Sequence, residues 1–267
     1  MENKSSELEV AIRAAKEAGK ILEKYFEKEI LKEFKADNSV VTKADGEAEE
    51  AIKKVIWESF PNHSILGEET GHTKNGGEHT WHIDPLDGTR NFSNGIPLFA
   101  VSIALDHKDK QVLGVVYNPA TRSLFYAEAG KGAYLNGKKI SVSGDDAPRS
   151  IISSGKSRKD IDRKLCRKLM QNLPDRFPGL TVRDFGSAAL DLAYVACGGF
   201  EATIHLGLNS YDFAAGTILV EEAGGKITTL QGGAWQFPQN YFVASNGVFH
   251  DKLVEQIKND KEELGID

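Results

Sequence analysis

Two aspartates, Asp84 and Asp87, stand in the run Asp-Pro-Leu-Asp-Gly-Thr, directly after a short apolar stretch. The apolar stretch is typical of a buried strand, and Pro85 favours an extended backbone before it, so we expect the strand to end near Asp84 with its carboxylate exposed. Gly88 and Thr89 should begin a helical turn whose first N–H groups have no intrahelical partner. Carboxylates bind hard cations such as Mg²⁺, and such N–H groups bind phosphate. The stretch therefore indicates phosphate-ester chemistry.

Two further acidic residues are candidates for the same site. Glu68 follows an expected short strand over 64–67, and Asp212 lies just before an expected helix. Spacing alone does not place Asp212 beside the other three carboxylates. If all four meet in one cleft, their repulsion is tolerable only with cations between them. Oxygen-only ligands favour Mg²⁺ or Mn²⁺ over zinc, and a two-metal site can activate water and stabilise the leaving oxygen of a phosphate ester.

These motifs resemble those of the inositol monophosphatase family, part of the lithium-sensitive, Mg²⁺-dependent phosphatase superfamily. The resemblance extends from Lys35 to the last expected helix and rests on Glu68-Glu69, Asp84-Pro-Leu-Asp-Gly-Thr89, Tyr211-Asp-Phe-Ala-Ala-Gly and Glu222-Ala-Gly-Gly225. It implies an α+β protein with a layered αβαβα sugar-phosphatase fold. It also implies a homodimer that acts on a small phosphorylated substrate.

The resemblance assigns a role to each matching position. Two or three Mg²⁺ ions, with Mn²⁺ as a possible substitute, would be held by Glu68, Asp84, Asp87, Asp212 and the backbone carbonyl of Leu86. Asp45 and Thr89 would align and deprotonate the attacking water, and the N–H groups of Gly88 and Thr89 would bind phosphate. The implied substrate-binding set is Leu86, Asp87, Gly88, Thr89, Gly186, Ser187, Ala188, His205 and Asp212.

Some positions depart from the family pattern and leave the substrate open. His205 stands where many inositol monophosphatases have a glutamate that touches substrate hydroxyls, and it is either a structural histidine or a substrate contact. The loop 35–42 resembles histidinol-phosphate and nucleotide-phosphate relatives, although Val40 replaces a proline, whereas 186–194 resembles the inositol branch. Inositol monophosphate is the first expected substrate and histidinol phosphate the second. A nucleotide 3′-phosphatase, a fructose-1,6-bisphosphatase and a non-enzymatic metal-binding partner module are further alternatives.

The first half of the chain should supply an antiparallel sheet with two helices. Apolar residues at positions 8, 12, 15, 18, 22 and 25/26 predict an amphipathic helix, followed by a loop or short hairpin over 35–45. A second helix should begin at Thr42 or Asp45 and end before Pro61. The glycine-rich segment 71–78 is expected to be a mobile loop, and strands are expected over 99–105, 111–117, 123–127 and 132–135.

The second half alternates strand and helix, which indicates a second sheet flanked by helices. Strands are expected over 151–154, 180–184, 201–205, 226–230 and 242–244, and helices over 160–173, 187–197, 212–223 and 246–261. The polar segment 144–149 is the best candidate boundary. We therefore expect an N-terminal α+β lobe, 1–146, that carries the metal site, and a C-terminal α/β lobe, 147–267, that completes it.

The composition narrows the class of protein. The chain has 267 residues, a net charge of −6 and two cysteines, Cys166 and Cys197, without metal-type spacing. Both cysteines lie in apolar helical patterns and should be buried, reduced thiols, which fits a cytoplasmic protein. Charges from residue 2 onward argue against a secretory signal, and no apolar run approaches the ~20 residues that span a bilayer. No basic cluster alternates with aromatics, so nucleic acid is not an expected partner.

Overall fold

The computed structural model describes residues 4–266 apart from 27–31, 35–39, 147–149 and 155–158. Its first part confirms the expected helices and meander. The helices are α1 (Ser6–Tyr25), α2 (Lys43–Ser59) and α3 (Thr89–Ser93). The strands are β1 (Lys32–Phe34), β2 (Val40–Thr42), β3 (Ser64–Gly67), β4 (Gly71–Thr73), β5 (His79–Asp87), β6 (Ala100–His107), β7 (Lys110–Asn118), β8 (Ser123–Glu128), β9 (Gly132–Leu135) and β10 (Lys138–Ile140).

Strands β3 to β10 form one mixed sheet in the order β10-β9-β8-β7-β6-β5-β3-β4. Neighbouring strands in this sheet are antiparallel, except that β3 and β5 are parallel. The expectation of a loop over 71–78 is wrong at its start, because Gly71–Thr73 pairs with β3. Of the expected loop or short hairpin over 35–45, the structure has the hairpin, whose strands β1 and β2 span Lys32–Phe34 and Val40–Thr42. Residues 35–39 lie outside the described residues.

Strand β5 corrects the expectation of a strand that ends at an exposed Asp84. The strand continues to Asp87, and its pairing with β6 shifts register between Asp84 and Asp87. Proline has no N–H to give to a ladder, so a bulge accommodates Pro85 without ending the strand. Asp84 is consequently 1% exposed. Its carboxylate lies on the same face of the sheet as the side chain of His82, because side chains alternate along a strand.

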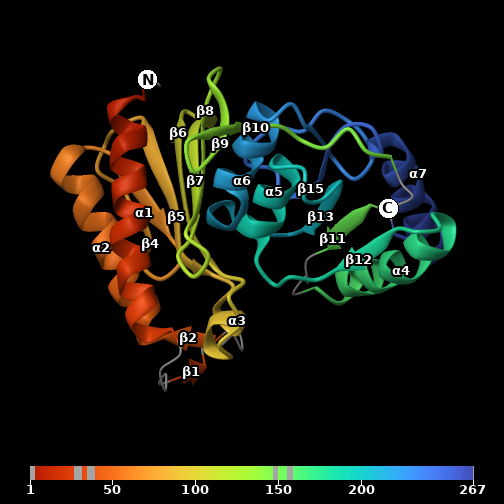
Figure 1. The fold of residues 1–267 in the computed structure, drawn as a ribbon, viewed down its shortest axis with the longest axis horizontal. Coiled ribbons are helices and arrows are strands. Elements are labelled where there is room, and N and C mark those ends of the chain that lie inside the picture. Colours follow the sequence, from red (N-terminus) through yellow and green to blue (C-terminus); the bar gives the residue numbers. More distant parts are fainter. Residues whose placement is uncertain (1–3, 27–31, 35–39, 147–149, 155–158, 267) are drawn as a thin grey trace.

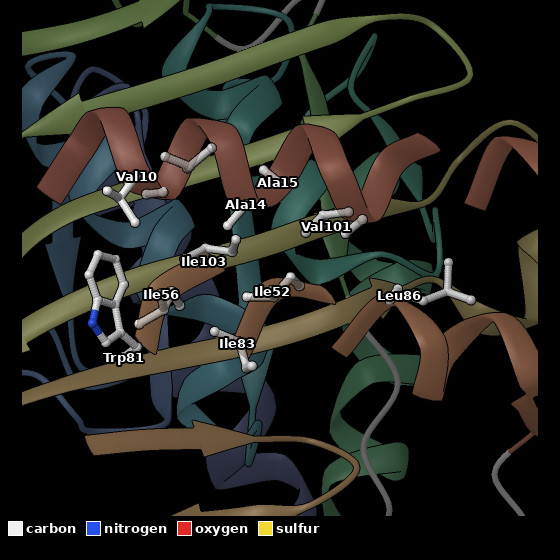
Figure 2. Packing of buried hydrophobic residues seen from close by; sticks show 14 of the residues in the cluster. Val10, Ala14, Ala15, Ile52, Ile56, Trp81, Ile83, Leu86, Val101 and Ile103 are labelled. Carbon is white, nitrogen blue, oxygen red and sulfur yellow. The ribbon is translucent and has the colours of Figure 1, made fainter. Parts of the chain in front are cut away.

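Helices α1 and α2 cover one face of this sheet and bury its apolar side chains (Figure 1). Trp81, Ile83 and Leu86 of β5 point into this layer. Figure 2 shows the packing of Val10, Ala14, Ala15, Ile52, Ile56, Trp81, Ile83, Leu86, Val101 and Ile103. The sheet is therefore anchored on this side by hydrophobic burial, and the opposite face of β5 is left to carry His82 and Asp84.

Among its described residues, the second part of the chain adds a five-stranded mixed sheet and four helices. The strands are β11 (Ile151–Ser154), β12 (Thr181–Arg183), β13 (Ala202–Leu206), β14 (Lys226–Thr228) and β15 (Tyr241–Ser245), in the order β12-β11-β13-β15-β14. The helices are α4 (Asp160–Arg176), α5 (Ala188–Ala196), α6 (Ser210–Glu222) and α7 (His250–Leu264). The α6 helix begins before Asp212, so Asp212 lies within its first turn and not ahead of it.

Helices α5 and α6 lie between the two sheets, and α4 and α7 cover the outer face of the second sheet (Figure 1). The layers are thus helices, sheet, helices, sheet, helices, which confirms the expected αβαβα arrangement. Cys166 is buried and Cys197 half-buried, and both are free thiols. Within the part of the chain that the structure describes, none of the helices is both long and apolar enough to cross a lipid bilayer.

Helix α7 begins four residues later than expected, and His250 at its start ties it to the sheet. One ring nitrogen of His250, Nδ1, lies 2.7 Å from Ser245 Oγ of β15, and the other, Nε2, lies 2.8 Å from Thr228 Oγ1 of β14. Burial is the main reason that the pKa of His250 falls from 6.5 to about 4. The neutral ring therefore serves as a cross-link between three elements.

Glycines let α6 approach its neighbours closely. A Cβ on Gly114 of β7 would lie 2.5 Å from the carbonyl oxygen of Ala215, and one on Gly216 would lie 2.4 Å from Cβ of Leu192 in α5. Such distances are shorter than atoms tolerate, so a side chain at either position would push α6 away. The close approach of α6 to β7 and to α5 therefore depends on these two glycines.

We expect Gly114→Ala to lower the free energy of unfolding by about 1–3 kcal/mol, because the added methyl overpacks the contact with α6. Gly46→Ala is the matched control: it lies in α2, and its Cβ would meet nothing within 4 Å. This control should be neutral or stabilising by up to about 1 kcal/mol. Urea unfolding of both variants measures the difference, and equal stabilities would contradict the close-packing argument.

We expect stability to fall as the pH drops from about 7 towards 4, in part through His250. Its folded-state pKa is lowered, so the unfolded chain binds a proton at a higher pH than the folded chain, and protonation favours unfolding. His250→Gln should make the loss shallower by on the order of 1 kcal/mol, measured by urea unfolding at several pH values. His72→Gln, at an exposed position, is the control. An unchanged pH slope in His250→Gln would refute the assignment.

Candidate active site

Asp84, on β5, is the centre of an acidic cluster whose other members come from the first sheet, α2 and α6. Its carboxyl is fully buried, and its pKa is raised well above the ordinary value, first by burial and then by the charges of Glu68, Asp87, Asp212 and Asp45. The structure thus brings Asp212, from α6, into electrostatic range of Asp84, which is also in range of Glu68, Asp87 and Asp45. Spacing in the sequence could not provide that placement.

The Asp87 carboxylate is held by the start of α5. Its Oδ2 accepts hydrogen bonds from Ser187 Oγ at 2.5 Å and from the N–H of Ala189 at 2.8 Å. Burial raises the pKa of Asp87 to about 6, although the hydrogen bonds from Ser187 and Ala189 oppose the rise. Ser187 is the N-cap of α5 and accepts the N–H of Leu190. The predicted pocket residue Ser187 is therefore a direct partner of the predicted metal ligand Asp87.

Backbone N–H groups also orient the other two aspartates. Asp84 Oδ1 accepts the N–H of Leu86 at 2.9 Å. Asp212 forms a capping box with Asn209 at the start of α6, in which its Oδ2 accepts the Asn209 N–H at 2.7 Å. Each carboxylate thus has one oxygen fixed by a local donor, which restricts the rotation of the side chain.

Glu68 lies at the end of β3, where its N–H donates to the carbonyl of Ile83 in β5. The turn that follows Glu68 is held by hydrogen bonds to Glu49 of α2, whose side chain is fully buried. Glu49 accepts the N–H of Glu69 at 2.9 Å, the N–H of Thr70 at 3.1 Å and the Thr70 hydroxyl at 2.5 Å. Sequence reasoning missed Glu49. The available signal was an acidic residue one helical turn after Asp45, on a face otherwise made of Ala48 and Ile52.

Asp45 and Thr89, the predicted water-activating pair, come from different helices, α2 and α3. Asp45 is 1% exposed in the first turn of α2. Thr89 is the first residue of α3, and its hydroxyl donates to the carbonyl of Leu86 at 3.1 Å. The turn between Asp87 and Thr89 requires glycine, because Gly88 has φ 90° and a Cβ there would lie 2.7 Å from the carbonyl oxygen of Leu98. This tight turn brings the first N–H groups of α3 beside Asp87.

Gly186 and Ala188 flank Ser187 at the entry to α5, where Gly186 adopts a positive φ of 68°. His205 lies elsewhere: it is 0% exposed on β13, inside the second sheet. Its Nε2 pairs with Thr203 Oγ1 at 2.9 Å, and burial lowers the pKa of His205 to about 3, so the ring is neutral. In this structure His205 has the environment of a structural histidine, without surface for a substrate.

The donors around Asp84 fit a hard divalent cation. Among the described residues, no three His, Cys, Asp or Glu side chains lie close enough together to hold a metal ion without moving. The cluster nevertheless offers oxygen atoms from carboxylates, the chemistry that Mg²⁺ and Mn²⁺ prefer. A cation there would also offset the like-charge repulsion that raises the pKa of Asp84.

Known proteins resemble this chain over nearly its whole length. A model of the inositol monophosphatase family matches residues 3–262. The Nus factor SuhB of Pasteurella multocida is 36% identical over 261 residues, 94% of each chain. The fructose-1,6-bisphosphatase/inositol-1-monophosphatase of Aquifex aeolicus is 35% identical over 263 residues, 97% of each chain.

A solved structure shows the same arrangement of layers. The Thermotoga maritima IMPase superimposes with a TM-score of 0.87 at 33% identity, and the match covers 98% of this chain and 100% of the other. Family model, full-length relatives and fold agree with one another and with the acidic cluster around Asp84. The chain belongs to the inositol monophosphatase family.

Proposed function

We propose that the chain is a Mg²⁺-dependent phosphomonoesterase that acts on a small polyol or sugar phosphate, with inositol monophosphate as the first candidate. The observation that carries the proposal is the buried Asp84 surrounded by the charges of Glu68, Asp87, Asp212 and Asp45. A cluster of carboxylates around a buried aspartate is a poor way to stabilise a fold and a suitable way to hold cations. The adjoining Gly88–Thr89 turn adds N–H groups suited to a phosphate.

In this proposal Glu68, Asp84, Asp87, Asp212 and the carbonyl of Leu86 hold the metal ions. Bound Mg²⁺ would supply Lewis acidity for the phosphate and for the attacking water. Asp45 and Thr89 orient that water and take its proton, and the Thr89 hydroxyl is already directed by the Leu86 carbonyl. The N–H groups of Gly88 and Thr89 bind the phosphate oxygens. The entry to α5, Gly186 to Ala188, borders the substrate.

The proposal extends to the organisation of the molecule. Residues 1–146 and 147–267 form two lobes, the second of which completes the site through α5 and α6. The active form is a cytoplasmic homodimer that lithium inhibits and that also accepts Mn²⁺. Direct recognition of substrate by His205 is left out of the mechanism, because the side chain is fully buried.

Two other functions have a specific observation in their favour. One full-length relative is named a fructose-1,6-bisphosphatase as well as an inositol monophosphatase, which supports a sugar bisphosphate as the alternative substrate. Another is named a Nus factor, which supports the alternative of a partner module that keeps the metal site. The presence of Asp45 and Thr89 beside the acidic cluster favours the enzyme, since a partner module has no need of a water-activating pair.

The test is phosphate release with and without Mg²⁺ from inositol 1-phosphate, histidinol phosphate, fructose 1,6-bisphosphate, a nucleoside 3′-phosphate and p-nitrophenyl phosphate. We expect metal-dependent release, with the highest kcat/KM on inositol 1-phosphate. A higher kcat/KM on another ester would replace the substrate and keep the reaction class. Failure to hydrolyse any of them in the presence of Mg²⁺ would leave the partner module as the better function.

We expect Asp87→Asn to lower kcat/KM on the best substrate by on the order of 10²-fold or more, because one charged metal ligand is lost. The fold should remain, since the amide oxygen of asparagine can still accept from Ser187 and Ala189, and the repulsion on Asp84 decreases. Asp175→Asn, at an exposed position on α4, makes the same charge change as a control. Steady-state kinetics and urea unfolding measure both effects. Near-normal turnover by Asp87→Asn would remove Asp87 from the metal site.

A further inference from the structure

A buried hydrogen-bond relay connects three elements beside the acidic cluster. His82 of β5 is 7% exposed and Asp106 of β6 is 5% exposed. Nε2 of His82 lies 2.7 Å from Asp106 Oδ2, and its Nδ1 lies 2.8 Å from Ser210 Oγ, the first residue of α6. Phe237 packs edge-on against the imidazole of His82, with 5.3 Å between the ring centroids. The relay is therefore shielded from water over most of its length.

The hydrogen bonds of Asp106 determine which ring nitrogen of His82 carries the hydrogen. Asp106 Oδ1 accepts the N–H of Asp109 at 3.0 Å, so both oxygens of this carboxylate serve as acceptors. Nε2 of His82 must then carry a hydrogen, and in the neutral ring Nδ1 is an acceptor that receives the hydroxyl hydrogen of Ser210. Asp106, fixed by the N–H of Asp109 in the turn between β6 and β7, thus orients the imidazole, and the imidazole in turn holds the first residue of α6.

The relay joins the same two elements as the metal site. His82 precedes Asp84 by two residues on β5, and Ser210 precedes Asp212 by two residues on α6. Residues two apart on a strand share a face, so His82 and Asp84 point to the same side. A second tie in this turn is the hydrogen bond from Ser102 Oγ of β6 to the carbonyl of Tyr211 at 3.0 Å. The position of Asp212 relative to Asp84 is therefore set by neighbouring hydrogen bonds.

We propose that His82 and Ser210 are positioning residues that hold Asp212 at the distance from Asp84 that divalent-cation binding requires. The proposal rests on the proposed function, through the assignment of Asp84 and Asp212 as metal ligands. Without the relay, the repulsion between Asp212 and Asp84 pushes the first turn of α6 away from β5. Loss of a residue that orients a metal ligand typically costs about 10–100-fold in metal affinity.

The test compares Mn²⁺ binding, measured by electron paramagnetic resonance, in the full chain and three variants. Ser210→Ala removes the hydroxyl from a half-buried position and should raise the Kd for Mn²⁺ about 10-fold. Ser210→Thr keeps the hydroxyl and should bind Mn²⁺ like the wild type. Ser245→Ala is the matched control, because it breaks a similar buried bond, 2.7 Å to His250, in the second sheet. It should shift the unfolding midpoint as Ser210→Ala does and leave the Kd unchanged.

Other results would overturn the positioning role. These are an unchanged Kd in Ser210→Ala, an equal rise in Ser245→Ala, or no saturable Mn²⁺ binding by the wild type. Ser, His and Asp side chains also form nucleophilic relays, so covalent labelling of Ser210 by diisopropyl fluorophosphate would likewise assign a different role. A wild type that binds Mn²⁺ but hydrolyses no phosphate ester contradicts the proposed function, and the Kd comparison still decides the role of the relay.

Discussion

Like-charge repulsion around a buried aspartate is the interaction to which the rest of this structure responds. Asp84 lies in range of four other carboxylates, and burial removes the water that would screen them. The fold offsets this cost by giving the carboxylates local donors: the Leu86 N–H, the Asn209 N–H, and the Ser187 hydroxyl with the Ala189 N–H. The acidic cluster thus persists because the chain around it is rich in oriented hydrogen-bond donors.

The layered architecture places β5 where those donors can reach its carboxylates. Hydrophobic burial under α1 and α2 fixes β5 on one face, which leaves the other face for Asp84 and His82 (Figure 2). Helices α5 and α6 fill the space between the sheets (Figure 1). The start of α5 holds Asp87 at the end of β5, and the first residue of α6 hydrogen-bonds to His82. Gly114 and Gly216 let α6 approach closely enough to reach it. Packing in the core therefore controls electrostatics at the site.

The sequence predicts the local part of this arrangement well, since hydrophobic period and turn residues act over short distances. Most strands and helices begin and end near their expected residues, and the Gly88 turn forms as its composition indicates. The exposed Asp84 was a wrong expectation, because the pairing with β6 overrides the tendency of Pro85 to end a strand. Glu49, and the contact of Asp106 with His82, were missed, because such contacts join segments whose proximity only the tertiary fold decides.

The hydrogen bonds from α5 to Asp87 also determine when, during synthesis of the chain, the Asp87 carboxylate becomes fixed. The donors to Asp87 lie 100 and 102 residues further along the chain. A chain emerging from the ribosome therefore exposes Asp84 and Asp87 well before Ser187 and Ala189 have been made. Until α5 docks, the first sheet holds its acidic side chains without the cap that constrains Asp87. The acidic cluster is therefore complete only late in translation, once α5 and α6 have been made.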